Sequence, residues 1–181
     1  MKDYLLSLAR ASIKSHFTHQ MLDTSVFEQE YSALQEGGAC FVTLTLDNEL
    51  RGCIGSVVAH RKLLDDVIDN AKSAAFRDPR FPSLSEDELD RVVIEVSVLS
   101  KPEVLEYTDF DDLVKKVRIG IDGIVLRFGN FQSTFLPQVW ESLPTHELFF
   151  SHLCQKAGLE SDCIKHRPQI QTYQVQKVVE S

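Results

Sequence analysis

The chain has 181 residues, of which 43% are hydrophobic and 25% charged, and its formal net charge is −8. This length and composition predict one globular domain with a substantial core, and the negative charge disfavours general binding to nucleic-acid phosphates. The N-terminal segment mixes charged with apolar residues, and no window approaches about 18 apolar residues, so we expect neither a signal peptide nor a membrane span. The four cysteines form no Cys-x-x-Cys pair. They predict no disulfide scaffold, and we expect a cytoplasmic protein.

The first elements expected along the chain are a helix and a β-hairpin. Apolar residues at helical spacing predict an amphipathic helix over 3–17. The segment 18–36 has no clear period and is expected to be a loop with at most one helical turn. Alternating apolar residues predict strands over 41–46 and 50–57, and the Asp47-Asn48 turn signal between them predicts antiparallel pairing.

A second helix and a strand are expected next. An apolar stripe predicts the helix between His60 and Asp78, and the prolines that follow end it. The Ser85–Glu88 stretch is a capping box that begins a short helix. Residues 91–99 alternate strictly, so we expect a strand in the same sheet as the hairpin.

The C-terminal half predicts a second hairpin, two helices and a last strand. We expect Thr108 to cap a helix over 109–117 and Gly158 to end a helix over 146–157. The hairpin is expected over 123–128 and 131–136, and the last strand over 172–179. Hairpins are frequent and helices do not alternate regularly with strands, which favours an α+β fold with a mostly antiparallel sheet.

The stretch "LRGCIG" is the first candidate site, because it places a cysteine between two glycines. In a regular strand Arg51, Cys53 and Gly55 share one face, which brings a guanidinium near the sulfur and favours the thiolate. The glycines Gly52 and Gly55 leave room for a ligand or another backbone to approach. The pattern therefore indicates a nucleophilic cysteine, but a buried packing cysteine beside a bulge is the alternative.

Two further residues are candidates for proton transfer. Glu95 interrupts an otherwise apolar strand, so it lies either on a solvated sheet face or in a pocket. His60 follows the cysteine strand and could act as a base, although a histidine at a helix start is more often a surface residue.

The segment "DPRFPSL" contains two prolines and should be a stiff loop. Sites collect on such loops, so we expect it to border the same cleft as Cys53. We expect Asp78 or Arg80 to hold it by a hydrogen bond to backbone. The alternative is a purely structural turn.

These stretches, in order, resemble the AMMECR domain family. The matching blocks are "LRGCIGSVVAHR", "NAKSAAFRDPRFPSL", "IEVSVL", "GIDGIVLRFGNFQSTFLPQVW" and "HLCQKAGL". The resemblance implies an α+β fold with a larger and a smaller lobe, the hallmark "LRGCIG" near the cleft between them, and a Memo-like protein and a radical SAM protein as partners. It also marks Asp122 as a candidate substrate-binding residue. It implies no settled reaction, and we expect no cofactor.

A metal site is the rival reading of the C-terminal region. His152, Cys154, Cys163 and His166 are zinc-type ligands, but His152 and Cys154 point about 200° apart on the expected helix. We therefore expect no metal here, only a core cysteine and surface histidines.

Two hypotheses remain. In the first, the protein is an enzyme or enzyme component acting on a small-molecule or protein substrate. Cys53 is then the nucleophile or redox thiol, Glu95 or His60 moves protons, and Arg51, Gly52, Gly55, Asp78, Arg80 and Asp122 bind the substrate. In the second, the protein is a binding module without chemistry, and Cys53 is a packing residue.

Overall fold

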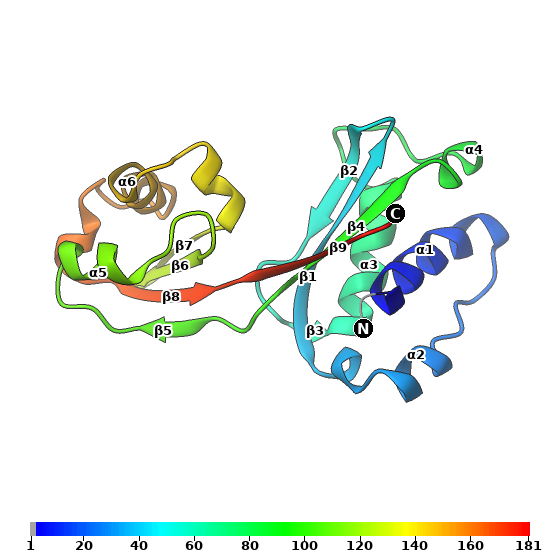
Figure 1. Ribbon diagram of the computed structural model, residues 1–181, viewed down its shortest axis with the longest axis horizontal. Helices are drawn as coiled ribbons and strands as arrows, with labels where there is room; N and C mark the ends of the chain where they lie inside the picture. The colour runs from blue at the N-terminus through cyan, green and yellow to red at the C-terminus, as the bar shows by residue number, and fades with distance from the viewer. Residues whose placement is uncertain (1–2) are drawn as a thin grey trace. The chain divides into compact units, whose positions relative to one another are not determined.

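The computed structural model describes residues 3–181 and shows an α+β fold with two antiparallel sheets (Figure 1), as the sequence predicts. The chain forms two compact units. Unit 1 comprises the chain up to Leu99 together with Gln176–Ser181, and unit 2 comprises Ser100–Val175. No helix in the described part of the chain is long and apolar enough to cross a membrane.

The sheet of unit 1 contains the expected hairpin. Its strands are β1 (Gly37–Leu46), β2 (Glu49–Gly55), β4 (Val93–Leu99) and β9 (Val175–Val179), in the order β2-β1-β4-β9, and the short β3 (Arg61–Lys62) pairs with β1. Asp47 and Asn48 have φ values of +53° and +66°. Two positive φ angles in a two-residue turn match the twist of an antiparallel hairpin. The predicted pairing of β1 with both β2 and β4 is confirmed.

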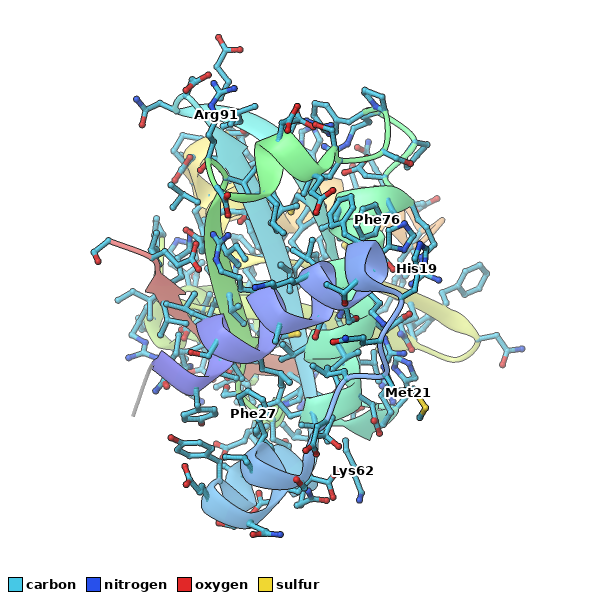
Figure 2. The ribbon with its side chains drawn as sticks, turned by 90° about the vertical axis from the view of Figure 1, so that its right-hand side faces the viewer. His19, Met21, Phe27, Lys62, Phe76 and Arg91 are labelled. Atoms are coloured by element: carbon cyan, nitrogen blue, oxygen red, sulfur yellow. A yellow bond between two sulfur atoms is a disulfide. The ribbon has the colours of Figure 1, made fainter. Side chains whose placement is uncertain are left out.

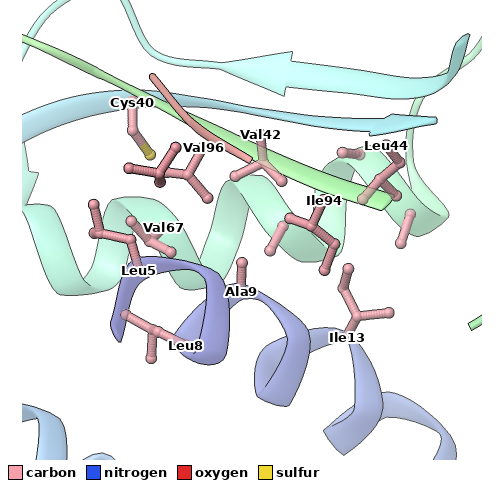
Figure 3. Close-up of a cluster of buried hydrophobic side chains, with 14 of the residues drawn as sticks. Leu5, Leu8, Ala9, Ile13, Cys40, Val42, Leu44, Val67, Ile94 and Val96 are labelled. Carbon is pink, nitrogen blue, oxygen red and sulfur yellow. The ribbon is translucent and has the colours of Figure 1, made fainter. Parts of the chain in front are cut away.

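Two helices cover one face of this sheet. Helix α3 (Leu63–Phe76) packs on β1 and β2, and α1 (Asp3–Thr18) lies across α3 (Figure 2). Phe76, at the end of α3, stacks on His16 of α1 with ring centroids 3.9 Å apart. The helices contribute Leu5, Leu8, Ala9, Ile13 and Val67 to the core, and the strands contribute Cys40, Val42, Leu44, Ile94 and Val96 (Figure 3).

Burial follows the alternation of the strands. Val42, Leu44 and Ile94 are fully buried, so their neighbours Thr43 and Glu95 project from the opposite face. This outward face of the sheet is where the candidate residues lie. The capping box begins α4 (Glu86–Leu89), as predicted.

The segment 18–36 contains more helix than predicted. It forms α2 (Ser25–Glu30) and a 3₁₀ turn, η1 (Ser32–Gln35). Helix α2 is so short that it has no buried residue. Its apolar period is therefore too brief to be recognised in the sequence.

Unit 2 has its own sheet and core. The strands are β5 (Glu103–Leu105), β6 (Gly123–Phe128), β7 (Phe131–Phe135) and β8 (Gln169–Tyr173), in the order β5-β8-β6-β7. The helices are α5 (Phe110–Lys116) and α6 (His146–Lys156), with 3₁₀ turns η2 (Pro137–Glu141) and η3 (Cys163–His166). Trp140 stacks on Phe149 at 3.7 Å in the core. Gly158 follows α6 with a φ of +84°, which confirms the predicted stop.

Three expectations about this half of the chain are wrong. The last strand is two strands, because Gln174 separates β8 of one sheet from β9 of the other. Asp109, not Thr108, caps α5 by accepting a hydrogen bond from the backbone of Asp112. Cys154 and Cys163 form a disulfide with Cα atoms 5.8 Å apart.

Candidate functional site

The hallmark strand β2 contains a β-bulge at Arg51. Gly52 pairs with Leu44 and Leu50 pairs with Thr45, so Arg51 is the extra residue. A bulge breaks the strict alternation of side chains and redirects the residue it contains. The prediction that Arg51 and Cys53 share one face required a regular strand, and the bulge makes this prediction wrong.

The guanidinium of Arg51 is bound by the 82–88 segment. Its Nε and Nη2 donate to the two carboxylate oxygens of Glu88 at 2.8 and 2.9 Å, and Nη1 donates to the carbonyl of Pro82 at 2.9 Å. These bonds, with that from the backbone N–H of Ser85, lower the pKa of Glu88 to about 2. Arg51 therefore has a structural partner that sequence reasoning missed, and Glu88 serves both this pair and the capping box.

Cys53 lies on the outward face of the sheet. Its thiol is half-buried, and its Sγ is 3.3 Å from the Thr43 hydroxyl on the neighbouring strand. Thr43 and Cys53 are direct cross-strand partners. Sequence reasoning also missed Thr43, because the residue opposite Cys53 depends on the strand register.

The peptide groups of Cys53 are held by the "DPRFPSL" loop. Strand β2 is at the edge of its sheet, and the Cys53 N–H donates to Oδ2 of Asp78 at 2.9 Å. The Cys53 carbonyl accepts a hydrogen bond from Nη2 of Arg80 at 3.2 Å. The expected hydrogen bonds of Asp78 and Arg80 to backbone are confirmed, whereas a cleft shared by the loop and Cys53 stays a prediction. The same contacts protect the exposed strand edge from pairing with another chain.

Asp78 and Arg80 form one unit. Arg80 donates to both carboxylate oxygens of Asp78, with Nε at 3.0 Å and Nη2 at 2.7 Å. The Arg80 guanidinium, followed by the backbone N–H groups of Cys53 and Arg80, holds the pKa of Asp78 well below its usual range despite burial of the carboxylate. Arg80 is thus the arginine that accompanies Cys53, and its side chain is 53% exposed.

The two glycines of the hallmark are explained by packing. A Cβ at Gly52 would lie 2.1 Å from the Ala74 carbonyl oxygen, so only glycine lets α3 approach β2 this closely. A Cβ at Gly55 would lie 2.3 Å from the Phe41 ring. Protein atoms therefore fill the space that we expected for a ligand.

Glu95 is half-buried on the same face as Cys53, but one strand further away. Thr43 pairs with Cys53 on one side and with Glu95 on the other. Since neighbouring strands are about 4.8 Å apart, the backbones at Cys53 and Glu95 are separated by roughly 10 Å. Glu95 accepts hydrogen bonds from Ser97 at 3.2 Å and pairs with Lys177 at 3.3 Å. The carboxylate of Glu95 thus has its hydrogen bond and ion pair with Ser97 and Lys177, and none with Cys53.

His60 and Asp122, the remaining candidates, each have local contacts of their own. His60 is exposed, and its Nδ1 is 3.0 Å from the Val58 carbonyl. Asp122 belongs to unit 2, where it is buried. It accepts hydrogen bonds from Arg118 and Gln174, which lower its pKa against the effect of burial. It organises the turn before β6.

The other cysteines cannot substitute for Cys53. Cys40 is a free thiol in the core of unit 1, where burial, followed by the charge of Asp66, raises its pKa. Cys154 and Cys163 are joined in the disulfide, so neither offers a thiolate to a metal. Within the described residues, no group of three or more acidic, histidine or cysteine side chains could hold a metal ion.

Comparison with known proteins gives one family. The AMMECR1 family model matches residues 6–178. Protein SSO0193 of Saccharolobus solfataricus is 42% identical over 165 residues, which cover 88% of this chain and 72% of that protein. Protein MJ0810 of Methanocaldococcus jannaschii is 35% identical over 166 residues, which cover 88% of this chain and 79% of that protein.

A solved structure supports the same assignment. The crystal structure of the uncharacterized protein PH0010 from Pyrococcus horikoshii matches with a TM-score of 0.78 and 31% identity. The match covers 99% of this chain and 91% of the other. The chain therefore belongs to the AMMECR1 family.

Proposed function

We propose that Cys53 is a reactive thiol, and that the protein is an enzyme or enzyme component whose substrate approaches the outward face of the unit 1 sheet. The observation that carries the proposal is the placement of this thiol. It is half-buried rather than buried, its Sγ is 3.3 Å from the Thr43 hydroxyl, and its peptide groups are fixed by Asp78 and Arg80. A nucleophile gains most from such fixed geometry, because orientation is established before the reaction.

The reaction class proposed is attack of sulfur on an electrophilic carbon, which transfers the group containing that carbon from its leaving group to Cys53. The electron pair of the thiolate forms the new C–S bond, the bond to the leaving group breaks, and its electron pair leaves with that group. The thiol proton passes to water or to the leaving group. The Thr43 hydroxyl, 3.3 Å from Sγ, is placed to donate a hydrogen bond to the sulfur during this step.

Arg80 indicates the charge of the substrate. Its Nε and Nη2 bind Asp78 and the Cys53 carbonyl, and no described residue accepts a hydrogen bond from Nη1. A half-exposed guanidinium with a free N–H beside a thiol suits a carboxylate or phosphate on the substrate. We therefore propose a small anionic substrate, with Arg80 in the role that we had expected of Arg51.

The second candidate function is a binding module without chemistry. Its support is that Arg51 is neutralised by Glu88 and that both hallmark glycines are required for packing. On this reading "LRGCIG" is a folding element, and Cys53 is a packing residue without a chemical role.

Alkylation with iodoacetamide from pH 6 to 9 distinguishes the two functions, with each cysteine followed by peptide mass spectrometry. We expect Cys53 to react faster than a free cysteine peptide at pH 7, and Cys40 in the same sample to stay protected as the buried control. Arg80→Gln and Thr43→Val should each slow the reaction of Cys53. If Cys53 is alkylated no faster than the free cysteine peptide, the result would favour the binding module without chemistry instead.

The biological setting is part of the same proposal. We place the protein in the cytoplasm, and we propose a Memo-like protein and a radical SAM protein as its partners because the family resemblance implies them. Affinity purification of the chain and of its Cys53→Ser variant tests this. If the association does not depend on the thiol, the intact chain and the variant should each capture the two partners. If the intact chain captures neither partner, the partners are removed from the proposal.

A further inference from the structure

Unit 2 contains a cavity of about 470 Å³ that the proposed function does not use. Its volume is in the range of small-ligand sites, roughly 300–1,000 Å³. The apolar part of the wall is formed by Phe110, Phe150 and Ile164, from α5, α6 and η3. Three separate elements thus enclose an apolar space that a small molecule could occupy.

The cavity wall is fixed by the disulfide. Cys154 lies in α6, and Cys163 is the first residue of η3. The bond between them joins the two elements that supply Phe150 and Ile164. A wall that is already fixed lowers the entropic cost of binding.

Opposite charges without an ion-pair partner line the same cavity. Among the side chains of the described residues, Arg167 donates one hydrogen bond, at 3.3 Å to the Tyr107 carbonyl, and it pairs with no carboxylate. The side chain of Glu147 likewise has no ion pair or hydrogen bond within the described chain, whereas Asp162 is paired with Lys165 and Asp109 caps α5. The cavity therefore offers one exposed guanidinium and one exposed carboxylate, neither of them ion-paired, beside an apolar floor.

The backbone at Arg167 ends η3. Its φ of +52° lies in the left-handed region, and its N–H donates to the Ile164 carbonyl at 2.9 Å, which is a common way for a helix to end. The side chain of Arg167 is exposed, so its guanidinium is accessible to a ligand from solvent.

We propose that this cavity binds a small apolar zwitterion, that is, an amino acid or dipeptide with a large apolar side chain. Arg167 takes the carboxylate, Glu147 takes the ammonium group, and the side chain fills the space between Phe110, Phe150 and Ile164. Each charge of a zwitterion pairs with the opposite charge of the cavity. A simple anion is instead repelled by the Glu147 carboxylate, and a simple cation is repelled by the Arg167 guanidinium.

Three probes with the same side chain test the proposal on the full chain. They are L-phenylalanine, which is a zwitterion, N-acetyl-L-phenylalanine, which is an anion, and L-phenylalanine methyl ester, which is a cation. In ¹H–¹⁵N spectra we expect shifts confined to residues 108–110, 147–151 and 161–167. We expect L-phenylalanine to bind about 10-fold or more tightly than either of the others, the effect of one charge-assisted hydrogen bond.

Two variants assign the charges. Arg167→Asn suits the left-handed backbone, which asparagine tolerates, and should bring the affinity for L-phenylalanine down to that for the ester. Glu147→Gln, on an exposed helical turn, should bring it down to that for the N-acetyl form. Arg127→Gln and Glu103→Gln remove the same charges from exposed positions outside the cavity and should change nothing.

The outcomes are decisive in each direction. Equal binding of the three probes would show adventitious apolar occupancy and overturn the proposal. Preference for the N-acetyl form would make the site an anion site, and shifts outside the cavity would place the ligand elsewhere. If Arg167→Asn fails to fold, the Glu147→Gln comparison still tests the zwitterion.

Discussion

The backbone N–H of Cys53 donates a 2.9 Å hydrogen bond to Oδ2 of Asp78, which lies 25 positions further along the chain. This contact joins the edge strand of unit 1 to the loop after α3. Because the Asp78 side chain is only 1% exposed and is ionised, it binds its donors more strongly than a neutral acceptor would. Cys53 owes its position to this carboxylate.

Asp78→Asn should therefore destabilise the protein by about 2–3 kcal/mol, the effect of losing hydrogen bonds to a buried charge. Urea unfolding at pH 7 measures the change. Asp47→Asn is the matched control. Asp47 is 74% exposed in its pair with Arg91, and asparagine accepts the positive φ of this position, so we expect a change within about 0.5 kcal/mol. Equal effects of the two variants would contradict the role of Asp78.

The pair between Arg51 and Glu88 should make stability depend on pH in the acid range. The pKa of Glu88 is lowered from 4.5 to about 2 in the folded chain, chiefly by the hydrogen bonds from Arg51. A carboxylate with a lowered folded-state pKa stabilises the fold fully above its unfolded-state pKa. This contribution is lost as the pH falls from about 4.5 toward 2.

Urea unfolding at several pH values between 7 and 2.5 tests this. The free energy of unfolding of the intact chain should fall more steeply below pH 4.5 than that of Glu88→Gln, and the two should converge at the acid end. Glu86→Gln removes a carboxylate from the same short helix without touching Arg51, and it should retain the steep fall. Parallel curves for the intact chain and Glu88→Gln would rule out this source of pH dependence.

Gly52→Ala should be among the most damaging single-methyl substitutions in the chain. The added carbon would lie 2.1 Å from a backbone oxygen of α3, and neither backbone can move without opening the core. We expect a loss of roughly 2–4 kcal/mol, or failure to fold. At Gly37 the nearest atom to an added Cβ is 4.0 Å away, so Gly37→Ala should be tolerated. Thermal unfolding compares the two variants.

The disulfide predicts a specific thiol count. Titration of the unfolded, unreduced chain should give two thiols, Cys40 and Cys53, and reduction should add two more. Replacing Cys154 and Cys163 together by alanine should cost about 2–3 kcal/mol, the chain-entropy value for a loop of nine residues or so. Four thiols before reduction would show that the bond is absent.

Local patterns were sufficient for most of the fold. Apolar periodicity identified α1 and α3, the turn signal at Asp47-Asn48 identified the hairpin, and Ser85 with Glu88 identified the capping box. These features depend on residues within one or two turns of each other, so the sequence displays them directly. The rigidity of the proline-rich loop was also a valid guide to its contact with Cys53.

What the sequence did not display were contacts between distant residues. The bulge at Arg51 depends on the register with β1, which no local pattern specifies. The partner of Arg51 is 37 positions away, in a motif that already had a complete local explanation. The disulfide was missed because a spacing of nine residues matches no common motif. From the sequence, Cys154 and Cys163 were considered together, but only as possible metal ligands.

The order of the chain has a consequence for how the protein is made. Unit 2 is encoded between β4 and β9, and its two ends are joined to each other by hydrogen bonds between Ser100 and Gln174. Glu180, which follows it, binds Arg10 and the backbone of Ile94 and so completes unit 1. During synthesis, unit 2 can therefore fold before β9, the edge strand of the unit 1 sheet, has been made. Helix α1 is synthesised before the other described elements, yet it is among the last of them to reach all its partners, because Arg10 binds Glu180.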